Sequence, residues 1–349
     1  AANRGPGILE ERGPREASAA TVELRAISIG QMLPVGTASA GKAVIVPRVT
    51  AARELFGDGS QGASAVKHYR NIDTFGELWV LPLGDDPQGI AAKGGIGITG
   101  TPSGSGSIIF EIDGELVTVS YSAADAPADI LARIATAMVS VADIPVSAGA
   151  VAAGTLPLTA RNKGEVGNDI LLAISDASSD YAADGLTITL TQLSGGTINP
   201  FAALPAALAS LGTRAFDFVG CPYLDTSALP ILKEFWNDTV GRWSWQQELF
   251  GHVFSARRGT LGQNAAFGAT VNNEHLTVMP VFDSPHSPLR WLAEITAGVA
   301  VKCRIDPGLP ITQVALTVGA PSVSNRPTFS EQNTLLYDGL STFSVADDG

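Results

Sequence analysis

Two stretches of the chain alternate apolar strands with helices, and a stretch of hairpins lies between them. The run Glu77–Leu83 is almost continuously apolar and is followed by Gly84-Asp85-Asp86-Pro87, which is typical of a strand covered by helices on both faces. The pattern returns after Asn199, where 216–222 reads as another buried strand. We therefore expect a discontinuous α/β core domain, built from residues 27–90 and 197–320, with the intervening residues inserted into it.

The intervening segment, residues 91–196, has the pattern of an inserted, hairpin-rich α+β module. Asp113-Gly114 lies between two alternating apolar runs, and this dipeptide in that position is a strong signal of a tight hairpin. Residues 126–139 place apolar side chains on one helical face. The segment holds 4 basic and 11 acidic residues, a net charge of 4 − 11 = −7 within a total of −12. We expect this acidic module to face outward.

Both ends of the chain have weaker patterns. Residues 1–26 are polar and interrupted by glycine and proline, which favours an extended N-terminal arm with one short strand at Ile8–Glu11; a disordered terminus is the alternative. Residues 321–349 are interpreted as a loop and hairpin.

Composition excludes several classes of partner. Charged residues are 16% of the chain, below the usual value of about 25%, so we expect partners to cover part of the surface. The net charge of −12 argues against nucleic acid and against an anionic membrane surface as partners. No apolar stretch approaches a transmembrane helix, and no secretory signal is visible. The two cysteines, Cys221 and Cys303, are interpreted as buried thiols of a protein made in a reducing compartment.

No pattern of catalytic, cofactor or metal chemistry is present. The four histidines have no metal-ligand spacing with one another or with cysteine, and His275, which begins an apolar strand, is expected to satisfy backbone groups. Gly94–Gly100 does not lie between a strand and a helix, as a phosphate-binding loop must. A Gly-x-Ser-x-Gly turn is also missing, although a Ser-His-Asp triad of distant residues stays open. We expect no catalytic residue, no cofactor and no metal.

The paired arginines Arg257 and Arg258 stand out because basic residues are scarce in this chain. They follow an apolar run and precede Gly259. One interpretation is a solvated strand end. The other is an intersubunit salt bridge to an acidic neighbour, which makes both arginines candidate intersubunit contacts.

Several segments resemble contractile phage tail sheath proteins. The general resemblance lies in Pro6–Glu11, Ala26–Gln31, Leu55–Ser60 and Asp73–Pro82. Similarity to the Mu-like branch lies in Thr159–Ile170, Gly251–Thr260 and Ser330–Gly339. Each motif alone is weak, but together they occur in order over about residues 6–349, and that order is specific.

The resemblance implies a structural protein of the virion and no enzyme. Sheath subunits would form hexameric rings around a tail tube and contract to drive the tube through the host cell envelope. The implied partners are other copies of the chain, the tail tube protein and the baseplate, with no nucleic acid and no membrane insertion, and assembly would take place in the bacterial host cytoplasm. The α/β core would be subtilisin-like in fold. The alternatives are the sheath of a tailocin-type injection machine and, from another class, a subtilisin-like hydrolase.

The resemblance also bears on the two ends of the chain. Family members continue past a segment like 334–345 into a C-terminal sheath domain, so we expect this chain to lack that domain and to be a monomer or weak oligomer alone. In the N-terminal arm, Ile8, Leu9, Glu10 and Glu11 become candidate intersubunit contacts. They would add as a strand to the open sheet edge of a neighbouring subunit.

Overall fold

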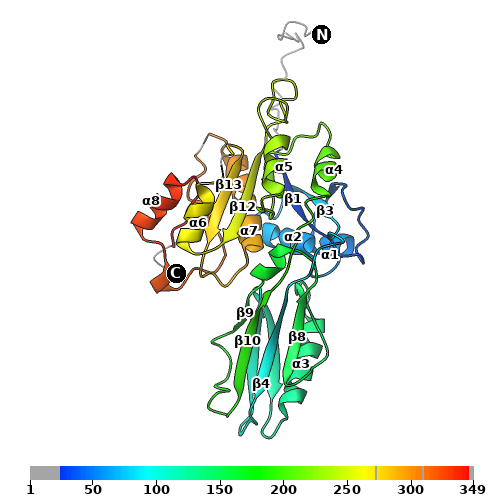
Figure 1. The fold of residues 1–349 in the computed structure, drawn as a ribbon, viewed down its shortest axis with the longest axis vertical. Helices are drawn as coiled ribbons and strands as arrows, with labels where there is room; N and C mark the ends of the chain where they lie inside the picture. The colour runs from blue at the N-terminus through cyan, green and yellow to red at the C-terminus, as the bar shows by residue number, and fades with distance from the viewer. Residues whose placement is uncertain (1–23, 272, 309, 346–349) are drawn as a thin grey trace.

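The computed structural model describes residues 24–271, 273–308 and 310–345. Its largest element is a six-stranded sheet in the order β13-β12-β11-β1-β3-β2, seen in the upper part of Figure 1. Neighbouring strands are parallel except at one edge, where β2 is antiparallel to β3. The strands are β1 (Arg25–Gln31), β2 (Val44–Ile45), β3 (Glu77–Leu83), β11 (Phe218–Gly220), β12 (His252–Arg258) and β13 (Leu276–Val281).

Helices cover both faces of this sheet. One apolar layer joins it to α1 (Val49–Phe56), α2 (Gln61–Ile72) and α7 (Pro288–Ile305). The other joins it to α4 (Leu204–Ala209), α5 (Ala228–Phe235), α6 (Leu261–Gly268) and α8 (Phe329–Tyr337). The strand side chains alternate between the layers: in β1, Ala26 packs in the first, while Ile27 and Ile29 pack in the second. The chain therefore has the mixed α/β architecture that the apolar runs predicted.

Residues 93–194 supply the two smaller sheets, which project from one end of the large sheet (Figure 1). One has the order β10-β4-β8-β7 and the other the order β6-β5-β9, with α3 (Pro127–Ser140) and a shared apolar core. We call residues 93–194 the module and the large sheet with its helices the core. The strands are β4 (Lys93–Thr99), β5 (Gly106–Ile112), β6 (Glu115–Tyr121), β7 (Val146–Ala148), β8 (Thr155–Ala160), β9 (Leu172–Ile174) and β10 (Thr187–Ser194).

The turn between β5 and β6 is the two-residue hairpin predicted from Asp113-Gly114. Both residues have positive φ, 52° at Asp113 and 85° at Gly114, as the turn that matches the strand twist requires. The strands pair from Ile112 with Glu115 outward to Gly106 with Tyr121. This hairpin points its turn toward the core.

The two ends of the chain correct two expectations. The hairpin expected in 321–349 is wrong for the part described: the chain forms α8, preceded by a short 3₁₀ turn at Val323–Asn325. The reason is a capping box, in which the Thr328 hydroxyl accepts the Glu331 backbone N–H and the Glu331 carboxylate accepts the Thr328 backbone N–H. At the other end β1 begins at Arg25, so the last residues assigned to the arm already belong to the sheet.

None of the helices within the described ranges is long and apolar enough to cross a lipid bilayer.

Candidate interface between the core and the module

The hairpin turn of the module lies against the N-terminus of α7 in the core. Ser287, the N-cap residue of α7, donates its backbone N–H to Asp113 Oδ1 (3.0 Å) and its hydroxyl to Asp113 Oδ2 (3.0 Å). A carboxylate at this position is favourable because the helix N-terminus carries partial positive charge. Burial raises the pKa of Asp113 to about 6, and the two hydrogen bonds from Ser287 oppose that rise. The carboxylate is therefore mostly ionised at neutral pH and bound at both oxygens.

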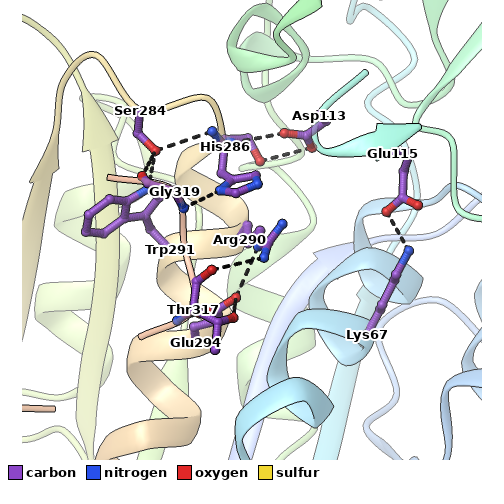
Figure 2. Close-up of polar contacts among 11 residues, drawn as sticks. Lys67, Asp113, Glu115, Ser284, His286, Arg290, Trp291, Glu294, Thr317 and Gly319 are labelled. Carbon is purple, nitrogen blue, oxygen red and sulfur yellow. Dashed lines mark hydrogen bonds and ion pairs between the residues drawn. The ribbon is translucent and has the colours of Figure 1, made fainter. Parts of the chain in front are cut away.

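Gly114 permits this close approach. A Cβ atom at this position would lie 2.9 Å from His286 Cδ2 and 3.1 Å from Arg290 Nη1, and its φ of 85° disfavours other residues. Figure 2 shows Asp113, the other turn residue, beside His286 and the beginning of α7. A larger residue at the second turn position would therefore add backbone strain and would displace the His286 or Arg290 side chain.

A second group of contacts joins the module to α1 and α2 through ion pairs. Lys67 Nζ lies 2.5 Å from Glu115 Oε1 and 3.3 Å from Asp143 Oδ2, and the first pair is visible in Figure 2. Arg53 donates Nε to Asp143 Oδ1 (2.8 Å) and Nη2 to its other oxygen (2.5 Å). Burial alone would raise the pKa of Asp143, but the hydrogen bond from Arg53 and the charge of Lys67 lower it. Asp143 is thus a buried anion shared by two cations of the core.

A third group surrounds the point where β3 leads into the module. Asp85, just after β3, accepts hydrogen bonds from Asn162 Nδ2 (2.9 Å), Gln31 Nε2 (2.7 Å) and the Lys163 backbone N–H (3.1 Å). Asn162 Oδ1 also accepts the backbone N–H of Gln61, the first residue of α2, at 3.0 Å. That N–H has no partner within its own helix. The module therefore supplies a hydrogen-bond acceptor at the N-terminus of each of two core helices.

A small cavity of about 30 Å³ lies among these contacts, enough for roughly one water molecule. Its lining includes Ser60, Asp113, Asn162, Asp169 and Ser287. Burial raises the pKa of Asp169 to about 6. Apolar side chains, among them Ile170 and Leu289, also line the cavity, which is too small for an organic ligand.

The segment that contains Thr317 and Gly319 follows α7 in the chain and is hydrogen-bonded to the first part of that helix and to His286, beside the interface. Glu294 is fully buried and accepts the Thr317 backbone N–H (2.6 Å), the Thr317 hydroxyl (2.9 Å) and Arg290 Nε (3.1 Å). The Gly319 backbone N–H donates to His286 Nδ1 at 2.6 Å, as Figure 2 shows. Because Nδ1 accepts this bond, it carries no proton, and burial lowers the pKa of His286 to about 4.

Arg257 and Arg258, the candidate intersubunit contacts, make different interactions in the structure. Arg258 donates to the backbone carbonyls of Ser284 (3.1 Å) and His286 (2.7 Å), and its Nε lies 3.7 Å from Asp169 Oδ1 of the module. Arg257 donates to Asn264 Oδ1 (2.9 Å) and lies over the ring of Phe267. Both arginines are thus engaged within the chain, and Arg258 contributes to the interface.

The other candidate contacts, Ile8, Leu9, Glu10 and Glu11, lie outside the described residues. Their intersubunit role therefore stays a prediction, as does that of the two arginines.

Of the interface residues, the sequence singles out Arg258, as a candidate contact between subunits. Its patterns mark Asp113 only as a turn residue and Asn162 only as part of a segment with family resemblance. A signal was nevertheless present, because Asn162 and Lys163 interrupt a hairpin-rich, apolar stretch immediately after a strand.

Within the described ranges, no hydrogen bond joins a serine hydroxyl to a histidine ring. The rings instead contact other groups: His252 Nε2 lies 2.7 Å from Thr277 Oγ1, and His275 Nε2 lies 3.0 Å from Asp238 Oδ1. What the interface can do is hold two parts of the chain in a fixed orientation.

Comparison with known proteins identifies relatives of the chain. Residues 199–349 match the family model described as the phage tail sheath protein central domain. The chain is 33% identical over 321 residues to the Mu-like prophage FluMu tail sheath protein of Haemophilus influenzae. That match covers 92% of this chain and 65% of the relative, so the chain spans less than two thirds of the relative's length.

Two solved structures are also similar. Both are described as crystal structures of a sheath tail protein. The one from Desulfitobacterium hafniense has a TM-score of 0.40 and 12% identity, covering 98% of this chain and 72% of that one. The one from Listeria innocua has a TM-score of 0.42 and 12% identity, covering 93% of this chain and 66% of that one.

Proposed function

We propose that this chain, a relative of the Mu-like phage tail sheath proteins, is a structural part of a contractile tail sheath. Copies would assemble as hexameric rings around a tail tube and contract to drive the tube through the host cell envelope. The observation that carries the proposal is the extent of the sequence relationship. The match to the Haemophilus influenzae sheath protein covers 92% of the chain, so it includes the module as well as the core.

The interface between core and module supports a mechanical role. Contraction of an assembled sheath is a rearrangement of rigid units, in which subunits move against one another while each keeps its shape. Here the module is fixed to the core by buried acceptors at two helix N-termini and by ion pairs around Asp143. A unit held in this way can transmit force without bending at the junction.

The proposal also includes the more detailed features that the charge pattern and the family resemblance predict. The core would be subtilisin-like in fold, and the acidic module would face the exterior of the particle. Ile8–Glu11 would add as a strand to a neighbouring subunit, and Arg257 and Arg258 would contact an acidic neighbour. The partners would be other copies of the chain, the tube protein and the baseplate. The chain would assemble in the host cytoplasm and reside in the virion.

A tailocin-type injection machine remains the alternative assembly, because the same subunit would serve it equally well. Capsid and terminase genes beside the coding gene would identify a phage. Their absence next to tube and baseplate genes would identify a tailocin.

Electron microscopy tests the proposal directly. The complete gene product is expressed together with the tube and baseplate proteins encoded beside it, and the products are purified and imaged. We expect striated tubes of six-fold symmetry in an extended and a shorter, wider form. A product that stays dispersed while the tube protein polymerises from the baseplate would contradict a sheath role.

A further inference from the structure

Three potential metal ligands meet on the core, away from the interface with the module. Asp238 lies in the connection between α5 and β12, and Glu274 and His275 come directly before β13. One ligand atom from each of the three side chains lies within 4.8 Å of the other two. His275 Nε2 is 3.0 Å from Asp238 Oδ1 and 3.8 Å from Glu274 Oε1. The sequence did not predict this cluster because Asp238 and His275 are 37 residues apart.

The imidazole is held in place before any ligand binds. The His275 ring stacks on the ring of Trp243, with centroids 4.5 Å apart and planes 21° from parallel. Its backbone N–H donates to Asn273 Oδ1 at 3.0 Å. The histidine side chain is only 8% exposed, while those of Asp238 and Glu274 are 61% and 59% exposed. A buried, oriented nitrogen thus faces two carboxylates that solvent can reach.

We propose that Asp238, Glu274 and His275 bind a divalent transition-metal cation, with Zn²⁺ as the representative ion. Zinc binds histidine nitrogen and carboxylate oxygen at about 2.0–2.2 Å in a tetrahedral arrangement, which places ligand atoms about 3.4 Å apart. The two separations from Nε2, 3.0 Å and 3.8 Å, lie on either side of that value. Water would complete the coordination from the exposed side.

The ligand types distinguish this ion from Mg²⁺ and Ca²⁺. Those cations prefer oxygen ligands only, whereas imidazole suits Zn²⁺ and its neighbours in the first transition row. In the metal-free protein His275 Nε2 and Asp238 Oδ1 lie within hydrogen-bonding distance of each other, at 3.0 Å. A bound cation would replace this hydrogen bond and would balance the charge of the carboxylates.

A bound cation would join two segments that are distant in the chain. The connection 236–251 has no helix or strand. Its Trp243 donates Nε1–H to the Gly251 carbonyl within the same connection (2.7 Å) and stacks on the ring of His275, just before β13. Coordination would link Asp238 in this connection directly to the beginning of β13. Because an ion that binds only the folded state stabilises it, thermal stability should rise with metal concentration.

Calorimetric titration of the full chain with ZnCl₂ after EDTA treatment and dialysis tests the proposal. We expect saturable binding of one ion per chain, a higher Tm with Zn²⁺, and a change in tryptophan fluorescence from Trp243. Asp238→Ala should weaken binding by at least about tenfold, and His275→Gln should abolish it. Glu234→Ala is the matched control, since it removes an exposed acidic side chain at the end of α5 and should leave binding unchanged.

Each other outcome overturns the proposal. No saturable binding to the unaltered chain would refute the site, and binding unaffected by Asp238→Ala would place the ion elsewhere. Mg²⁺ or Ca²⁺ binding as tightly as Zn²⁺ would refute the assigned class of metal. If His275→Gln fails to fold, the exposed Asp238→Ala variant still decides, provided that its Tm in EDTA equals that of the unaltered chain.

Discussion

Asp113 binds Ser287 at both carboxylate oxygens, across 174 residues of sequence, so that a hairpin turn of the module meets the N-cap residue of a core helix. Ser287 occupies the N-cap of α7 but makes no side-chain capping bond to its own helix. Its hydroxyl donates instead to the module. Asp113 of the module therefore supplies a hydrogen-bond acceptor at the N-terminus of α7, the longest helix of the described core.

Removing this carboxylate should destabilise the protein. Asp113→Ala leaves the Ser287 backbone N–H and hydroxyl buried without their acceptor, which we expect to cost about 1–3 kcal/mol of unfolding free energy. The measurement is urea denaturation at pH 7.5. Asp176→Ala, which removes an exposed acidic side chain of the same module, is the control and should change stability by less than about 0.5 kcal/mol. Equal effects of the two substitutions would show that the contact contributes nothing.

The close approach of the turn can be tested separately from its charge. Gly114→Ala adds a Cβ 2.9 Å from His286 Cδ2 at a position with φ of 85°. Gly195→Ala adds one at φ of 78° with no atom within 4 Å. The second variant measures backbone strain alone, about 1 kcal/mol, and the first adds the steric conflict. We expect Gly114→Ala to lower the urea midpoint clearly more than Gly195→Ala; identical midpoints would exclude a tight contact.

The ion pairs around Asp143 should matter more than a surface pair. The Asp143 side chain is 1% exposed and meets two cations, so Asp143→Asn leaves Arg53 and Lys67 facing a neutral group. We expect a loss of about 1–3 kcal/mol, reduced from the cost of breaking a fully buried pair because both cations are partly exposed. The matched substitution is Asp125→Asn in the pair with Arg133, whose side chain is 42% exposed. Asp125→Asn should lower the free energy of unfolding less than Asp143→Asn does in the same denaturation experiment, and the reverse order would contradict the structure.

Local sequence patterns predicted correctly the structural features that depend only on residues close together in the chain. Asp113-Gly114 predicted its hairpin, because the turn needs positive φ at two consecutive positions. The apolar run Glu77–Leu83 predicted a buried strand, because both of its faces are covered. The expectation of a loop and hairpin overlooked the helix after Thr328, although its capping box is also a local pattern.

These local patterns could not predict contacts between residues that are distant in the chain. The sequence around Asp113 would be the same whether its carboxylate faced solvent or bound Ser287. Only the three-dimensional fold shows that it binds Ser287. The same holds for Asp238 and His275. Acidic residues next to hairpin turns are common, so the sequence alone gave no reason to assign Asp113 to an interface.

Three histidines with lowered pKa predict acid sensitivity. Burial lowers the pKa of His68 to about 3 and that of His252 and His286 to about 4. The unfolded chain binds protons at these residues below about pH 6.5, whereas the folded chain does not until the pH reaches the lowered values. Stability is therefore lost as the pH falls from 6.5 toward 4, by about 2 kcal/mol per fully buried histidine at pH 5.

Asp113 and Asp169 act in the opposite direction. Their pKa values are raised to about 6 by burial, so the folded state takes up their protons first and gains stability as the pH falls from 6 toward 4. Three histidines with larger shifts oppose two carboxyl groups, so we expect a net loss of unfolding free energy between pH 7 and pH 5. Urea denaturation at several pH values measures this slope, and His68→Leu should flatten it while Asp113→Asn should steepen it. A slope that His68→Leu leaves unchanged would show that His68 is not the buried neutral group described above.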